Sequence, residues 1–347
     1  MCQKSSMKKI FSVVFAFILS TGLLLTACKK PVFAVSFVFC NGQETKVEKV
    51  AKGKKVTAPV VQNQPYYQFV GFFDQQGNAF DPNQKTTQNK TYYAKWKEKD
   101  EALSEVGKIA KQLQTLIILA EQNDICGQKA QIASTQLVRQ KKYSDVNWGL
   151  ICGSAPQKYV EAVQNFDKTL LELQNKSSIF YQSESVDFVH MIATLNSILV
   201  KGADSDPANL CGYVGDLCQI LAETNDLDPD DAKQYATYWI GRQNEGTFSA
   251  SDFWADILAL QLARTAQESN TSYANCIENV FALSKQQLVQ NFVQNTFGTT
   301  NKDVIVSKIT SAFDGFMVSY WLKSNGAANS QNKTAVALAF AEYILSF

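Results

Sequence analysis

The stretch Lys90-Thr-Tyr-Tyr-Ala-Lys-Trp96, followed a few residues later by Leu103 and Val106, marks a change in hydrophobic period. Up to Trp96, short runs of aromatic and polar residues alternate, as in strands whose side chains point to opposite faces of a sheet. From Leu103 onward, apolar residues recur every three or four positions, as on one face of a helix. The chain is therefore predicted to have a β-rich part followed by a helical part.

The β-rich part contains four predicted strands, at residues 35–39, 44–50, 67–73 and 90–96. Asn41-Gly42 follows the first of these strands and is a strong turn signal, because both residue types tolerate positive φ.

Residues 100–347 are predicted to be all-α, with nine or ten helices. Asp206-Pro207 and Asp228-Pro229 each combine an acidic N-cap with proline in the first turn, a favourable helix start. Other helices are expected at residues 156–173, 185–199, from 251 onward, 272–295, 302–324 and 332–346. The predicted fold class is α+β, with a small β-module before a larger all-α region.

Residues 33–97 resemble one internalin-type B-repeat, a small bacterial surface module. The matching pieces occur in order: Asn41-Gly42, then 52–56 with Pro59, then 67–74, then Phe80-Asp81, then 91–96. The resemblance implies a β-grasp-like fold and a surface or secreted location. It also implies a role as a spacer or weak binding module.

The N-terminal leader has Lys8 and Lys9 before an apolar run at residues 10–25, which is typical of an export signal. The run ends in Leu25-Thr26-Ala27-Cys28, which resembles a bacterial lipoprotein box. That resemblance implies cleavage before Cys28, lipidation of its sulfur, and a location on the extracellular face of the cytoplasmic membrane. An ordinary signal peptide cut nearby and an uncleaved N-terminal anchor are the alternatives.

The predicted organisation is a signal peptide at 1–27, a linker at 28–32, a β-module at 33–98 and an all-α domain at 99–347. The chain has 347 residues, of which 46% are hydrophobic and 12% aromatic, and this composition is sufficient for two folded units with buried cores.

Opposite charges are segregated along the chain, although the net charge is only +1. Residues 28–99 carry twelve lysines and five acids, a net charge of +7, whereas residues 100–347 carry 18 basic and 27 acidic residues, a net charge of −9. A basic segment beside a lipid anchor can bind an anionic membrane or wall surface, and a solvated lysine face is the alternative. The expected partners are the membrane, through the anchor, and a cell-wall polymer or a surface protein, with no nucleic acid.

Six cysteines lie outside the leader and the lipid site, and their redox state is left open between disulfides and buried free thiols. They are Cys40, Cys126, Cys152, Cys211, Cys218 and Cys276. Zinc is disfavoured because the chain has one histidine and no closely paired cysteines. Motifs for nucleotide or metalloprotease chemistry do not occur, so no cofactor is expected.

Asp216, Asp252 and Asp256 are the candidate catalytic residues. Asp252 and Asp256 are one helical turn apart, which is mildly destabilising for like charges unless another group offsets them. A carboxylate cluster of this kind could cleave glycans, with one acid protonated and one ionised. Alternatively, Asp252 only stabilises a first turn and Asp256 is exposed. His190 is read as an ordinary helix-face residue.

Asp226, Asp228 and Asp230 are the candidate metal ligands, because they occupy alternate positions as in a calcium loop. Asp231 replaces the glycine that such loops need, and helix capping by Asp228 is the competing explanation.

The predicted function is a lipid-anchored surface protein with a B-repeat-like spacer that presents an acidic helical domain for binding or a structural role. The alternative is a cell-wall glycan hydrolase that uses Asp216, Asp252 or Asp256.

Overall fold

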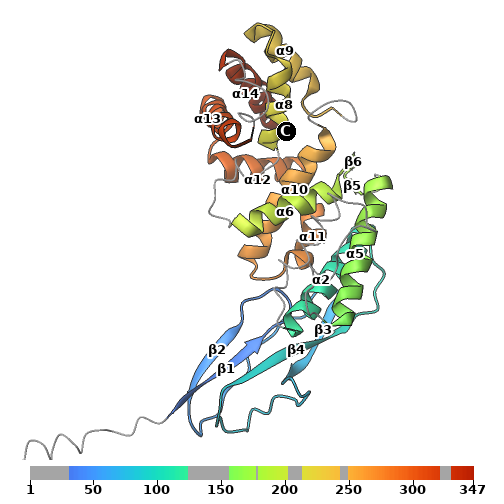
Figure 1. Cartoon of the computed structure of the whole chain (residues 1–347), viewed down its shortest axis with the longest axis vertical. Helices are drawn as coiled ribbons and strands as arrows, with labels where there is room; N and C mark the ends of the chain where they lie inside the picture. The colour runs from blue at the N-terminus through green and yellow to red at the C-terminus, as the bar shows by residue number, and fades with distance from the viewer. Residues whose placement is uncertain (1–30, 124–155, 177–178, 202–212, 243–248, 321–329) are drawn as a thin grey trace, which may run out of the picture. The chain divides into compact units, whose positions relative to one another are not determined.

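The computed structural model describes residues 31–123, 156–176, 179–201, 213–242, 249–320 and 330–347 (Figure 1). The leader, the lipid site at Cys28, the predicted helix start at Asp206-Pro207, and Cys126, Cys152 and Cys211 lie outside these residues. A four-stranded sheet is followed by helices, so the predicted α+β class, with a small β-module before a larger helical region, is confirmed.

All four predicted strands are present in the order β2-β1-β4-β3, which places β1 and β4 in the middle of the sheet. Their bounds are β1 Val32–Val38, β2 Lys46–Ala51, β3 Tyr67–Phe73 and β4 Lys90–Glu98. Strands β1 and β2 pair antiparallel, with Val32 opposite Ala51. Gly42, in the connection between them, has a φ of 83°, so a side chain there would be strained.

The described residues divide into two compact units, and the division cuts across the sheet. The sheet unit consists of the described residues of 1–37, 45–60 and 72–92, and the helical unit consists of those of 38–44, 61–71 and 93–347. One end of the sheet therefore belongs to the same compact unit as the helices.

Phe37 is the centre of the sheet unit's core and is fully buried. Its ring stacks on Tyr92 at 5.8 Å between centroids, and it meets Phe72 and Phe80 edge-on at 5.0 and 5.3 Å. On the strands, Tyr67, Phe72 and Tyr92 are also buried, each at most 5% exposed.

Ten helices are present in the described part of the chain, and all of them belong to the helical unit. Their bounds are α2 Glu105–Gln122, α5 Gln157–Lys176, α6 Phe188–Lys201, α8 Tyr213–Glu223, α9 Pro229–Trp239, α10 Ala250–Glu268, α11 Tyr273–Phe281, α12 Lys285–Phe297, α13 Lys302–Tyr320 and α14 Ser330–Leu345. Among those described residues, no helix has both the length and the apolar content that crossing a bilayer requires.

Helix α10 is the centre of the helical unit, because it contacts α6, α8, α11 and α12. It is buried around most of its circumference, as expected for a helix surrounded by others. Phe253, Trp254 and Leu258 on α10 are each at most 2% exposed.

The end of the sheet is joined to α2 and α11 by hydrogen bonds within the helical unit. The Tyr66 hydroxyl donates to Glu278 at 2.7 Å, and the hydroxyls of Tyr67 and Thr115 are 2.6 Å apart. Both tyrosines are buried in the same hydrophobic cluster as the helices. These contacts fix the register between the β-module end and the first helix.

A short hairpin, β5 Phe180–Tyr181 with β6 Glu184–Ser185, interrupts the region that was predicted to be all-α. Gln182 and Ser183 both have positive φ, as a two-residue hairpin turn requires. The predicted helix at 185–199 therefore begins later, as α6 at Phe188. Strands of two residues are too short to produce an alternating pattern.

The predicted helix at 272–295 is two helices, α11 and α12. Ser284 separates the two helices because it is the N-cap of α12. Its hydroxyl accepts from the backbone N–H of Gln287, and the Gln287 side chain accepts from the backbone N–H of Ser284. This capping box starts a new helix within an unbroken apolar pattern.

Gly241 should be far less tolerant of a side chain than Gly298, although both have left-handed φ, at 73° and 68°. A Cβ at position 241 would lie 2.5 Å from the Tyr343 hydroxyl oxygen, whereas nothing lies within 4 Å of one at 298. We expect Gly298→Ala to cost about 1 kcal/mol and Gly241→Ala roughly 2–4 kcal/mol in unfolding free energy. Urea denaturation measures both, and equal costs would contradict the packing at Tyr343.

Candidate functional site

The candidate site is built around Asp256, a carboxylate in the second turn of α10 with no exposed surface. The Thr194 hydroxyl donates to its Oδ1 at 2.8 Å, and His190 Nε2 lies 2.9 Å from the same oxygen. His190 and Thr194 are one turn apart on α6, as Asp252 and Asp256 are on α10. Two facing helices therefore each contribute a pair of residues at the spacing of one helical turn.

His190 forms an ion pair with Asp256, and its side chain is 20% exposed. Its backbone N–H donates to Asp187 Oδ1 at 2.8 Å, which fixes the start of α6. Burial lowers the pKa of His190, but the hydrogen bond and charge of Asp256, joined by the charges of Asp252 and Asp216, raise it from 6.5 to about 9. The imidazole is therefore positively charged at neutral pH.

Asp216, in the first turn of α8, lies near this ion pair without a hydrogen bond to it. Burial raises the pKa of Asp216 from 3.8 to about 8, the charges of Asp256 and Asp252 raise it further, and His190 offsets only part of this effect. Its Oδ2 is buried and has no hydrogen-bond partner among the described residues. Asp216 is therefore mainly protonated at neutral pH.

Asp252 is in the first turn of α10, where the Ser249 hydroxyl caps the helix and accepts from the Asp252 backbone N–H at 3.2 Å. Burial raises the pKa of Asp252, and the charge of His190 lowers it in part. The reading of Asp252 as a first-turn acid is consistent with this position. The alternative in which Asp256 is exposed is wrong, because the side chain is fully buried.

All three carboxylates predicted from the sequence interact electrostatically with His190. The imidazolium offsets the repulsion between Asp252 and Asp256, which are one helical turn apart and would otherwise destabilise the helix. Thr194 and the role of His190 were missed. The sequence does show a one-turn spacing between His190 and Thr194 and between Asp252 and Asp256. Only the structure shows that the two helices face each other.

The cluster contains two proton donors, Asp216 and the imidazolium of His190, beside carboxylates that can accept a proton. Such a set can perform acid–base chemistry or can simply neutralise charge inside a protein. Asp256 has no exposed surface, and its contact with His190 holds the imidazole in place.

Asp226, Asp228 and Asp230 are exposed and do not form a metal centre in this structure. Asp228 is the N-cap of α9, and its Oδ1 accepts from the backbone N–H groups of Asp230 and Asp231 at 3.0 and 2.9 Å. Within the described ranges, no three or more histidine, cysteine or acidic side chains are arranged to hold a metal ion. Helix capping accounts for Asp228 without a cation.

The three cysteines in the described residues are buried. Cys218 and Cys276 are free thiols, and burial raises their pKa values to about 12 and 11. The Cys40 thiol donates to the Val38 carbonyl at 3.7 Å. Thiols with such raised pKa values react slowly at neutral pH.

Residues 192–346 match a family model described as YkzU uncharacterised protein. The match covers less than half of the chain, and it includes Thr194, Asp216, Asp252 and Asp256. No curated protein and no solved structure matches the chain.

The single histidine allows a direct test of the ion pair, because only one imidazole contributes to the NMR spectrum. We expect His190 to titrate near pH 9, and Asp256→Asn to lower its pKa, because the strongest interactions that favour the charged form are removed and only the charges of Asp252 and Asp216 still oppose the effect of burial. The stabilisation from the pair should be complete below pH 6.5 and be lost as the pH rises through 9.

Glu268→Gln is the control for this titration, because Glu268 is an exposed acid at the other end of α10. It should leave the His190 titration unchanged. A wild-type pKa near 6.5 would contradict the ion pair.

Proposed function

We propose that the chain is a surface lipoprotein held by acylated Cys28 on the extracellular face of the cytoplasmic membrane. In this proposal the β-module is a spacer, and the acidic helical unit binds a wall polymer or a surface protein or has a structural role. A non-enzymatic role is supported by the burial of Asp256, because it leaves one of the three candidate catalytic carboxylates without surface for a substrate. Its carboxylate is engaged by His190 and Thr194 inside packed helices.

The anchor is supported by the sequence Leu25-Thr26-Ala27-Cys28 after a basic and apolar leader. Each buried methylene contributes about 0.8 kcal/mol, so two or three acyl chains hold a protein firmly at a bilayer. The sheet unit, which follows the linker, has seven lysines and three acids among its described residues. Its positive charge would strengthen contact with an anionic surface.

Cys28→Ala should release the chain from the membrane fraction, because no thiol remains for acylation. We expect the membrane-bound share to fall at least tenfold, measured by cell fractionation and by incorporation of labelled palmitate. Cys2→Ala is the matched control, since it removes a cysteine upstream of the proposed cleavage site and should change nothing. Unchanged retention of Cys28→Ala would rule out the lipid anchor.

A second candidate function, a wall-glycan hydrolase, is supported by the protonated state of Asp216. Glycoside hydrolysis needs one carboxylic acid to protonate the leaving oxygen and one carboxylate to act as base or nucleophile. Asp216, with its pKa raised to about 8, would be the acid, and Asp252 the carboxylate. Asp256 would hold His190 in place, and His190 would limit the charge repulsion between the two acids.

The hydrolase candidate predicts release of reducing ends from purified peptidoglycan, with activity falling above pH 8 as Asp216 loses its proton. Asp216→Asn should lower the rate at least about 100-fold, because general acid catalysis is removed. Glu268→Gln should leave the rate unchanged. Full activity in both Asp216→Asn and Asp252→Asn would eliminate this candidate.

A further inference from the structure

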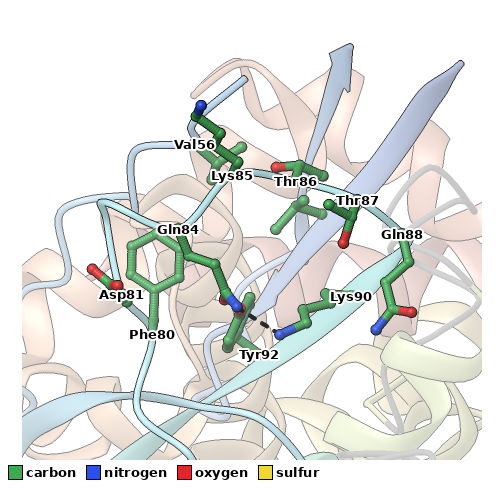
Figure 2. Close-up of a pocket in the computed structure, with 11 residues that line it drawn as sticks. Val56, Phe80, Asp81, Gln84, Lys85, Thr86, Thr87, Gln88, Lys90 and Tyr92 are labelled. Atoms are coloured by element: carbon green, nitrogen blue, oxygen red, sulfur yellow. Dashed lines mark hydrogen bonds between the residues drawn. The ribbon is translucent and has the colours of Figure 1, made fainter. Parts of the chain in front are cut away.

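The sheet unit contains a hollow between the strands β1 and β4 and the segment that leads into β4 (Figure 2). The hollow is shallow and partly open to solvent, and it is lined by Val35, Val56, Phe80, Asp81, Tyr92 and residues 84–88 with Lys90.

The base of the hollow is apolar and rigid. Val35, Val56 and Tyr92 are buried, and the half-buried Phe80 meets Tyr92 edge-on at 5.1 Å between ring centroids. Phe37 packs behind both rings. A ligand would therefore meet an aromatic wall whose position is set by the core.

The rim of the hollow is a loop whose backbone is held at several points. The Thr86 N–H donates to the Lys54 carbonyl at 2.8 Å, and the Thr86 carbonyl accepts from the Gly53 N–H at 2.8 Å. At its end, Asn89 Oδ1 accepts from the Ala34 N–H at 2.9 Å. The side chains between these points are thus presented from a fixed backbone.

Polar side chains on this rim retain hydrogen-bonding capacity. Lys90 Nζ donates to Gln84 Oε1 over a long 3.4 Å and lies 5.7 Å from the Tyr92 ring centroid, as Figure 2 shows. In the part of the chain that is described, the side chains of Thr87 and Gln88 make no hydrogen bond. The amide nitrogen of Gln84 likewise remains available.

The charge around the hollow favours an anion. Lys85 and Lys90 line it together with a single carboxylate, Asp81. The described residues of the whole sheet unit have seven lysines and three acids, a net charge of +4. An aromatic wall, free amides and an ammonium group together match a ring with an apolar face, hydroxyl groups and a negative charge.

We propose that this hollow binds an acidic sugar unit, with the C–H face of the ring against Phe80, hydroxyl groups at Gln84, Thr87 and Gln88, and the carboxylate at Lys90. The muramic acid of a wall glycan and a uronic acid of another polysaccharide share this chemistry. The site lies in the sheet unit, so a test of sugar binding there does not depend on the lipid anchor or on Asp216.

Isothermal titration calorimetry of the intact chain with two matched pairs of disaccharides tests the site. N-acetylglucosaminyl-N-acetylmuramic acid is compared with neutral chitobiose, and digalacturonate with neutral galactobiose. We expect at least one acidic disaccharide to bind tenfold or more tightly than its neutral partner, and the arm that does so identifies the source of the sugar. Absence of binding by both acidic sugars, or equal binding by their neutral partners, overturns the proposal.

Lys90→Met should weaken binding of the acidic sugar at least tenfold, because it removes the ammonium group and keeps a long side chain over Tyr92. Lys49→Met, on the exposed edge strand β2 and outside the hollow, removes the same charge and should change affinity less than twofold. Gln88→Ala, an exposed position, should cost about threefold. Equal losses in Lys90→Met and Lys49→Met would mean nonspecific charge attraction and would overturn the site.

Discussion

The ion pair between His190 and Asp256 joins α6 to α10 inside the helical unit. Removing an ionised carboxylate from water costs several kcal/mol, and this cost is recovered only with a well-placed partner and further hydrogen bonds. Asp256 obtains both from α6, through His190 and Thr194. Apolar side chains alone would tolerate sliding of α6 along α10, whereas the ion pair is compatible with one register. Because α10 also contacts α8, α11 and α12, that register affects most of the unit.

The same ion pair contributes, together with burial, to the protonation of the neighbouring carboxylates. Asp216 keeps a proton at neutral pH because it is buried near negative charges that one imidazolium only partly balances. This arrangement is compatible with either proposed function. A binding domain would need these buried groups to balance charge in its core. A hydrolase would need the same burial to keep Asp216 protonated. What separates them is whether a substrate reaches Asp216, and activity on peptidoglycan decides that.

Most of the secondary structure could be predicted from the sequence, because the strands and helices carry clear periods of two and of three to four residues. The exceptions have local causes. Hairpin β5–β6 is too short to show a period, and Ser284 divides an apolar pattern that looks continuous from the spacing alone. The candidate site was predicted in part: Asp216, Asp252 and Asp256 were chosen for residue type and spacing, whereas His190 was read as an ordinary helix-face residue.

The sequence by itself determined the two-part α+β architecture and the segregation of charge, because periodicity and composition are local properties of the chain. It also defines the leader and Cys28 as the basis for the anchor proposal. Only the tertiary structure decided that α6 faces α10, that Asp256 is buried, and that one end of the sheet belongs to the helical unit. These features depend on contacts between residues such as His190 and Asp256, which lie 66 positions apart, and no local pattern specifies such a contact.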